Sequence, residues 1–225
     1  MSAFRVALKL VKKSAIKRGL FRTMVFLVGE YWADLKFGIN THPTLIKSQP
    51  SSTKKRMQLE SFHFGTNWFI LREIFVKIIP KLKINFSSAH MIDYGSGAGR
   101  ALVAASYLGI SKVTGVEQDK TLCTLARKNI HKYIRKNTKK QKIRVVNKKA
   151  SSYAIPQSAN LFYLYNPFGR AVLRIVIKKI LSHIKRAKKK ALIIYVNPLY
   201  GNEFENAGFK KSNYSNQEVA IYEKS

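Results

Sequence analysis

From Ala89 onward, short apolar runs alternate with longer segments in which apolar residues recur every three to four positions. The first pattern is typical of buried strands and the second of amphipathic helices. The pattern predicts strands at about 90–94, 113–117, 143–146, 161–165 and 191–196, and helices at 98–109, 119–136 and around 172–180. Strands separated by helices in this way predict a doubly wound, mostly parallel α/β sheet. Two later pieces, 209–212 and 219–222, predict a closing pair of antiparallel strands.

The region before the sheet has a different character. Residues 3–36 show helical spacing with a break or bend at Gly19, 37–60 are polar and turn-rich, and 69–79 form an amphipathic helix that ends at Pro80. We therefore predict a helical, basic N-terminal arm with a linker over 1–60 and a main domain over 61–225. The aromatic-rich stretch 62–68 either forms a flap over a ligand or packs on the core.

The charge of the chain is strongly unbalanced. It has 42 Lys and Arg against 11 Asp and Glu, a formal net charge of +31, and the interval between Asp119 and Glu203 holds 21 basic residues and no carboxylate. Such a surface attracts polyanions such as RNA, DNA, ribosomes or an anionic membrane. Lysine, isoleucine and asparagine are all abundant, which can also result from a genome of biased nucleotide composition. Both interpretations of the charge stay open.

Targeting and redox signals are weak. The apolar run at 24–29 is far shorter than the roughly 20 residues that span a bilayer, so we expect a cytoplasmic protein without a transmembrane segment. Residues 1–29 carry seven Lys and Arg and no acid, which is compatible with a transit peptide or with a helix lying on a surface. The single cysteine, Cys123, excludes a disulfide scaffold.

The densest chemical signal lies at 91–100, where an apolar strand, an acid and three alternate glycines precede a helix. Gly95 and Gly97 allow positive φ and leave no Cβ in the way of a ligand, and the following helix start presents unpaired N–H groups. Asp93 stands two residues before the first glycine. Glu117 ends the next strand, 22 residues after Gly95, at a distance that suits a ribose ligand.

This arrangement, Asp-x-Gly-x-Gly-x-Gly at 93–99 followed by a strand ending in Glu117, resembles motifs I and II of class I S-adenosylmethionine-dependent methyltransferases. With 37–41, 164–169 and 195–198, the resemblance covers about 30–225 and is to uncharacterised bacterial members and to small protein-lysine methyltransferases. It implies a Rossmann-like, seven-stranded sheet over 61–225, with S-adenosyl-L-methionine as cofactor and no metal ion.

The resemblance also implies which residues bind the cofactor. Asp93 would hold the methionine amino group, the backbone at 95–97 would pack against methionine and ribose, and Glu117 would accept both ribose hydroxyls. The complete set that it implies is Thr66, Asp93, Gly95, Ser96, Gly97, Gly99, Glu117, Gln118, Lys149 and Ala150.

The sequence departs from the family pattern after the third strand of the sheet. An acid usually receives the adenine amino group there, but residues 147–150 read Asn-Lys-Lys-Ala, and lysine has no acceptor. The side chain of Asn147 or Ser151, or a backbone carbonyl, would have to take its place.

The methyl acceptor is expected beside Asn166, Pro167 and Phe168, because ligands of open α/β sheets meet the carboxyl ends of strands. These residues resemble the Asn-Pro-Pro-Phe/Tyr motif of amino-methylating enzymes without its second proline. The Asn carbonyl would accept a hydrogen bond from an amine, and Phe168 would stack on a base or line a lysine channel. Further candidates for the channel wall are Tyr163, Tyr165, Tyr195 and Trp68.

The most specific hypothesis is therefore methyl transfer to an amine nitrogen on a macromolecule, with a protein lysine as the first choice. An RNA or DNA base is the alternative that the charge favours, and a target in an anionic assembly such as the ribosome would reconcile the two. A non-catalytic nucleic-acid-binding protein on the same fold is a further alternative. A nicotinamide-dependent oxidoreductase is disfavoured by the glycine spacing.

Overall fold

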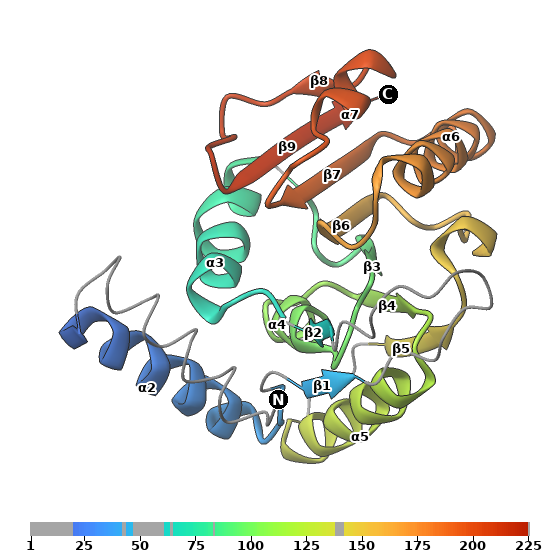
Figure 1. Ribbon diagram of the computed structural model, residues 1–225. Coiled ribbons are helices and arrows are strands. Elements are labelled where there is room, and N and C mark those ends of the chain that lie inside the picture. Colours follow the sequence, from blue (N-terminus) through green and yellow to red (C-terminus); the bar gives the residue numbers. More distant parts are fainter. Residues whose placement is uncertain are drawn as a thin grey trace, which may run out of the picture.

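The computed structural model describes residues 20–41, 44–46, 61–63, 65–82, 84–137 and 142–224. Its centre is a seven-stranded sheet with the strand order β5-β4-β3-β6-β7-β9-β8 (Figure 1). The strands are β3 (His90–Tyr94), β4 (Lys112–Glu117), β5 (Lys142–Asn147), β6 (Leu161–Tyr165), β7 (Ala191–Val196), β8 (Lys210–Lys211) and β9 (Val219–Lys224). The first five in space are parallel, and β9 is antiparallel to both β7 and β8. The predicted mostly parallel sheet with a closing antiparallel pair is confirmed.

Helices cover both faces of this sheet (Figure 1). The helices around the sheet are α3 (Trp68–Arg72), which precedes β3, and α4 (Arg100–Tyr107), α5 (Lys120–Lys136), α6 (Arg170–Ala187) and α7 (Asn202–Asn206), which follow strands of the sheet. One core cluster joins α3, α4 and α5 to Met91, while the other joins α6 and α7 to Ile92. These two neighbours on β3 are both fully buried, because alternate side chains of a strand point to opposite faces and helices cover each face.

The segment after α3 differs from the single helix predicted over 69–79. The helix widens into a π-helical stretch, Glu73–Ile78, and then tightens into a 3₁₀ turn, Ile79–Leu82. Pro80 lies at the second position of that turn, where its missing N–H removes no helical hydrogen bond. The proline therefore follows the π-helical stretch and starts the tighter turn.

The N-terminal part contains α2 (Leu20–Phe37), β1 (Thr44–Ile46) and β2 (Ser61–His63), with β1 and β2 forming a separate antiparallel pair. The helix α2 ends at Gly38, whose φ of +68° allows the Ile39 N–H to bond back to the Asp34 carbonyl. The stretch predicted as a linker thus contains β1 and the last residue of α2. The rest of the predicted arm falls on 1–19, 42–43 and 47–60, which lie outside the described residues.

Strand order reverses beside β3. From β3 the chain first builds β4 and β5 on one side and then returns to build β6 and β7 on the other. The chain therefore leaves β3 and β6 toward helices on opposite faces, α4 and α6, at the carboxyl edge of the sheet, which is where open α/β sheets bind ligands. In the part of the chain that the structure describes, no helix combines the length and the apolar content that a membrane span requires.

Candidate functional site

A cleft of about 850 Å³ lies at this reversal point. Its wall includes eleven of the thirteen residues predicted for the site, namely Thr66, Asp93, Gly95, Ser96, Glu117, Gln118, Lys149, Ala150, Asn166, Pro167 and Phe168. The other two, Gly97 and Gly99, shape the loop without lining the cleft. The structure thus brings both halves of the predicted site to one cavity, including Asp93 and Asn166, which are 73 positions apart in sequence.

The glycine loop has a backbone that only glycine adopts easily. Gly95, Gly97 and Gly99 all have positive φ, at +76°, +52° and +88°. A Cβ on Gly95 would lie 2.6 Å from the Cβ of Pro167, so the loops that follow β3 and β6 touch at this point. The Gly95 N–H donates to the Val116 carbonyl at 2.8 Å, which ties the loop to the end of β4.

Glu117 stands at the end of β4 and holds the same loop from the other side. One of its oxygens accepts from the Gly97 N–H at 3.0 Å, and the other accepts from the Asp119 N–H at 2.8 Å. A carboxylate oxygen can accept two hydrogen bonds. Each oxygen therefore keeps one direction for a ligand, which matches a pair of neighbouring hydroxyl groups.

Asp93 is the more deeply buried of the two acids, since it is 3% exposed and Glu117 is 7% exposed. Burial raises the pKa of this carboxyl well above its usual value, and the nearby charge of Glu117 raises it further. Among the described residues, none donates a hydrogen bond to its side chain. A buried carboxylate that faces a cleft in this way is suited to a ligand that brings a positive charge and N–H donors.

Ser96 lies between the two acids in the loop, and its side chain is 7% exposed. Its hydroxyl is buried and has no hydrogen-bond partner among the described residues. Gly115 makes room for it, since a Cβ there would lie 2.5 Å from the Ser96 oxygen. The sequence did not reveal this role of Gly115, because a glycine inside a strand does not indicate which side chain packs against it.

Two residues, at the end of β5 and just after it, are candidates to replace the acid that usually receives the adenine amino group. The side-chain amide of Asn147 donates to the backbone carbonyls of Glu117 and Gln118, at 3.0 and 2.9 Å, and the residue does not line the cleft. Ser151 does line it, and its backbone carbonyl accepts from Lys179 at 2.8 Å. Of the two side chains considered, that of Ser151 remains within reach of a ligand.

The far end of the cleft is formed by two Asn-Pro turns at the ends of β6 and β7. Asn166 and Asn197 both have positive φ, +37° and +50°, a conformation that is uncommon outside glycine and costs of the order of 1 kcal/mol or more. The hydroxyl of Tyr195 donates to the side-chain oxygen of Asn166 at 3.0 Å. Burial raises the pKa of Tyr195, so this hydroxyl keeps its proton at neutral pH and fixes the orientation of the Asn166 amide.

The predicted aromatic wall is present only in part. Tyr163 and Tyr165 line the cleft, and the Tyr163 hydroxyl is 2.6 Å from the Thr66 hydroxyl. Tyr195 does not line the cleft but lies behind Asn166. Trp68 also lies outside the cleft wall, because it stacks on Phe37 with ring centroids 4.9 Å apart. In the stretch predicted to form a flap or to pack on the core, Thr66 lines the cleft and Trp68 packs against Phe37.

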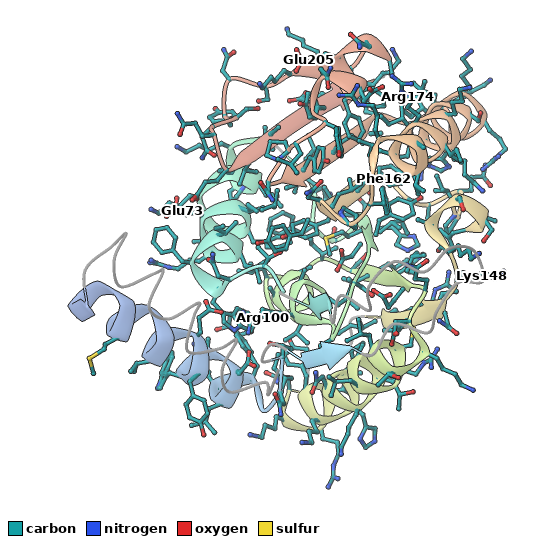
Figure 2. The ribbon with its side chains drawn as sticks, in the orientation of Figure 1. Glu73, Arg100, Lys148, Phe162, Arg174 and Glu205 are labelled. Carbon is teal, nitrogen blue, oxygen red and sulfur yellow. The ribbon has the colours of Figure 1, made fainter. Side chains whose placement is uncertain are left out.

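Arg100 is the residue of the site that sequence reasoning did not identify. It is buried at the start of α4, directly after the glycine loop, and points toward α2 (Figure 2). Its guanidinium forms an ion pair with Glu30, lies 3.5 Å from an oxygen of Asp34, and donates to the Thr41 hydroxyl at 2.6 Å. Because these partners belong to α2 and the turn after it, Arg100 attaches the N-terminal part to the glycine loop.

No family model matches the sequence, and no curated protein matches it. Among solved structures, the fold is similar to a ribosomal protein L11 methylase from Lactobacillus delbrueckii subsp. bulgaricus, with a TM-score of 0.52, 15% identity, and coverage of 72% of this chain and 80% of that chain. It is also similar to a candidate RNA methyltransferase from Pyrococcus horikoshii, with a TM-score of 0.51, 17% identity, and coverage of 70% and 83%.

A third similar structure is magnesium protoporphyrin IX methyltransferase from Synechocystis, determined with bound S-adenosylmethionine. It has a TM-score of 0.51 and 10% identity, and the match covers 69% of this chain and 77% of that chain. At these identities the likenesses concern the fold, and one fold hosts many functions. The chain has the Rossmann-like fold of class I methyltransferases.

Proposed function

We propose that this protein is an S-adenosylmethionine-dependent methyltransferase that methylates an amine nitrogen of a macromolecule, with a protein lysine as the preferred acceptor. The observation that carries the proposal is the pair of buried carboxylates, Asp93 and Glu117, which line one cleft on either side of a glycine loop. Each presents a different hydrogen-bonding capacity, and together they suit a ligand with an ammonium group at one end and a ribose diol in the middle.

The residues around the loop fit such a cofactor. Asp93 would bind the methionine ammonium, the free acceptor directions of Glu117 would take the ribose hydroxyls, and the Ser96 hydroxyl would find the partner that it lacks among the described residues. The adenine would lie against Ala150, with Ser151 as an acceptor for its amino group. S-adenosylmethionine supplies a methyl group already activated by the sulfonium, so the protein has only to bind, align and exclude water.

The Asn-Pro turns support an amine as the acceptor group. The Asn166 side-chain oxygen keeps one direction free beside the bond from Tyr195, and it would accept from an acceptor N–H. A lysine must lose its proton before it attacks, which costs roughly 4–5 kcal/mol at neutral pH if its pKa is about 10.4. The aromatic rings of Tyr165 and Phe168 at the cleft would lower that cost, because desolvation disfavours the charged amine.

An RNA or DNA base remains the second candidate, because the charge of +31 favours a polyanion. A base amine carries no deprotonation cost, but the base has to be unpaired or flipped to reach the cleft. Two of the similar structures are a ribosomal protein methylase and a candidate RNA methyltransferase. A protein target within a ribonucleoprotein would use both the amine chemistry and the charge.

The test is to incubate the purified protein with methyl-labelled S-adenosylmethionine and cell lysate, and to digest the products with protease or nuclease. We expect label that nuclease leaves intact and protease removes; label with the opposite sensitivity would exclude a lysine. Glu117→Gln should abolish labelling, whereas Glu223→Gln, the same change at an exposed position of β9, should not. A protein that binds RNA tightly but not S-adenosylhomocysteine would instead be a non-catalytic binding protein.

A further inference from the structure

The helix α2 presents a row of large apolar side chains to solvent. Met24, Val28, Tyr31, Trp32 and Leu35 are between 58% and 65% exposed. Their spacing of three or four residues places them on one face of the helix, over about three turns. We refer to these five residues as the α2 stripe. Isolated exposed apolar residues are ordinary, but a continuous apolar face marks a surface that binds something.

The orientation of this helix is set by the opposite face. Glu30 and Asp34 point into the protein, where they meet Arg100, and Asp34 also accepts from the Thr41 hydroxyl at 2.8 Å. Phe37 is buried against the core. Because α2 is held by buried ion pairs and by the turn that follows it, the α2 stripe cannot rotate inward without breaking those contacts.

The same contacts remove negative charge from the outer face. Both acids of α2 are paired with Arg100, so this helix contributes no unpaired carboxylate. Lys36 lies over the ring of Trp32, with its nitrogen 5.5 Å from the ring centre. The described side chains therefore form an apolar face with a positive charge, that of Lys36, beside its aromatic ring.

We propose that the α2 stripe binds the surface of an anionic lipid bilayer, an interaction that is independent of the methyl-transfer activity. Two copies of a chain that each carry +31 repel one another, which disfavours a dimer through this face. Nucleic acid satisfies the basic charge but offers nothing to Val28 or Leu35. An amphipathic helix with exposed Trp and Tyr, in a chain of high positive charge, has the composition of helices that lie in the headgroup region of anionic membranes.

The position of α2 suits such contact. It lies at one edge of the molecule, away from the sheet and from α6 (Figure 1). Arg100 connects α2 to the glycine loop, so the bound protein would keep its cleft at a fixed orientation to the membrane.

The test is sedimentation of the full-length protein with phosphatidylcholine vesicles that contain or lack phosphatidylglycerol. We expect binding to the anionic vesicles, weakened at least about tenfold by Val28→Glu and by Trp32→Glu. The matched control is Ile175→Glu, which makes the same change in charge at a 45% exposed apolar residue of α6. It should bind anionic vesicles as the wild type does.

Three results would overturn the proposal. Equal losses in Ile175→Glu and Val28→Glu would mean that net charge alone drives binding. Unchanged binding in both stripe variants would mean that another surface is used. A stripe variant that melts well below the wild type, or that converts a dimer into a monomer in light scattering, would mean that the protein itself covers the α2 stripe. Cofactor binding by the variants, measured by calorimetry, shows whether they are folded.

Discussion

The clearest consequence of the site concerns the proton on Asp93. In the ligand-free protein, burial and the charge of Glu117 raise the pKa of this carboxyl well above its usual value. A cofactor whose ammonium lies beside Asp93 would favour the carboxylate, so binding should release a proton. Below the pKa of the free protein, affinity should fall by up to tenfold, or about 1.4 kcal/mol, for each pH unit. Above that pKa it should be constant.

The stability of the ligand-free protein should also depend on the protonation of Asp93, but it should fall as the pH rises, whereas the affinity for the cofactor rises. A carboxyl whose pKa is higher in the folded state than in the unfolded state contributes stability at low pH that is lost as the pH rises through the folded-state value. Above its folded-state pKa, Asp93 is a buried charge without a described donor, and it then destabilises the free protein. Asp93→Asn keeps the shape and removes the charge, so it should bind cofactor more weakly yet unfold at higher denaturant concentration.

The assay is calorimetric titration with S-adenosylhomocysteine from about pH 5 to about pH 7.5, in buffers of different ionisation enthalpy, so that released protons are counted. At pH values below the pKa of Asp93 in the free protein, the wild type should release up to one proton on binding, and Asp93→Asn none. Glu223→Gln, which also removes one negative charge, should behave as the wild type does. A variant at position 93 that retains the pH dependence, or that is less stable than the wild type, would refute the reasoning.

Three further changes test the loop, the attachment of α2 and the acceptor end. An alanine at position 95 has to adopt positive φ, and its Cβ meets the ring of Pro167, so Gly95→Ala should destabilise the fold by about 1–3 kcal/mol and weaken cofactor binding. The control is Gly169→Ala, where a Cβ meets nothing within 4 Å. It should change the free energy of unfolding, measured by denaturant titration, by less than about 1 kcal/mol. Among the described residues, Arg100 is the only cation paired with buried Asp34 and partly buried Glu30, so Arg100→Met leaves them with neutral donors alone and should cost about 3–5 kcal/mol by the same measurement. Lys77→Met breaks a surface pair and should cost less than about 1 kcal/mol. Equal costs would show that the Arg100 pairs have no special role. Tyr195→Phe removes the hydroxyl that donates to the Asn166 side chain, so it should lower kcat about tenfold and leave the affinity for S-adenosylhomocysteine unchanged. A change in that affinity with unchanged kcat would show that Tyr195 supports cofactor binding and not the methyl acceptor.

Much of the fold could be predicted because its signals are local. Runs such as 161–165 and 191–196 are strands with the predicted bounds, since each has apolar residues at consecutive positions and is buried on both faces. The glycine loop and the two acids were recognisable for a related reason. Positive φ at three alternate positions and a carboxylate at a strand end are requirements on single residues, and they are visible wherever those residues stand.

The sequence by itself therefore determined the strands, the loop and the identity of the two acids. Only the tertiary structure decided which partner each polar group takes. Arg100 pairs with an acid 70 positions away, Tyr195 reaches back 29 positions to Asn166, and Asn147 uses its amide on backbone carbonyls and not on the cleft. Periodicity says whether a side chain is buried, but the pairing of buried polar groups depends on how elements far apart in the chain are packed, and that information is held in no single segment.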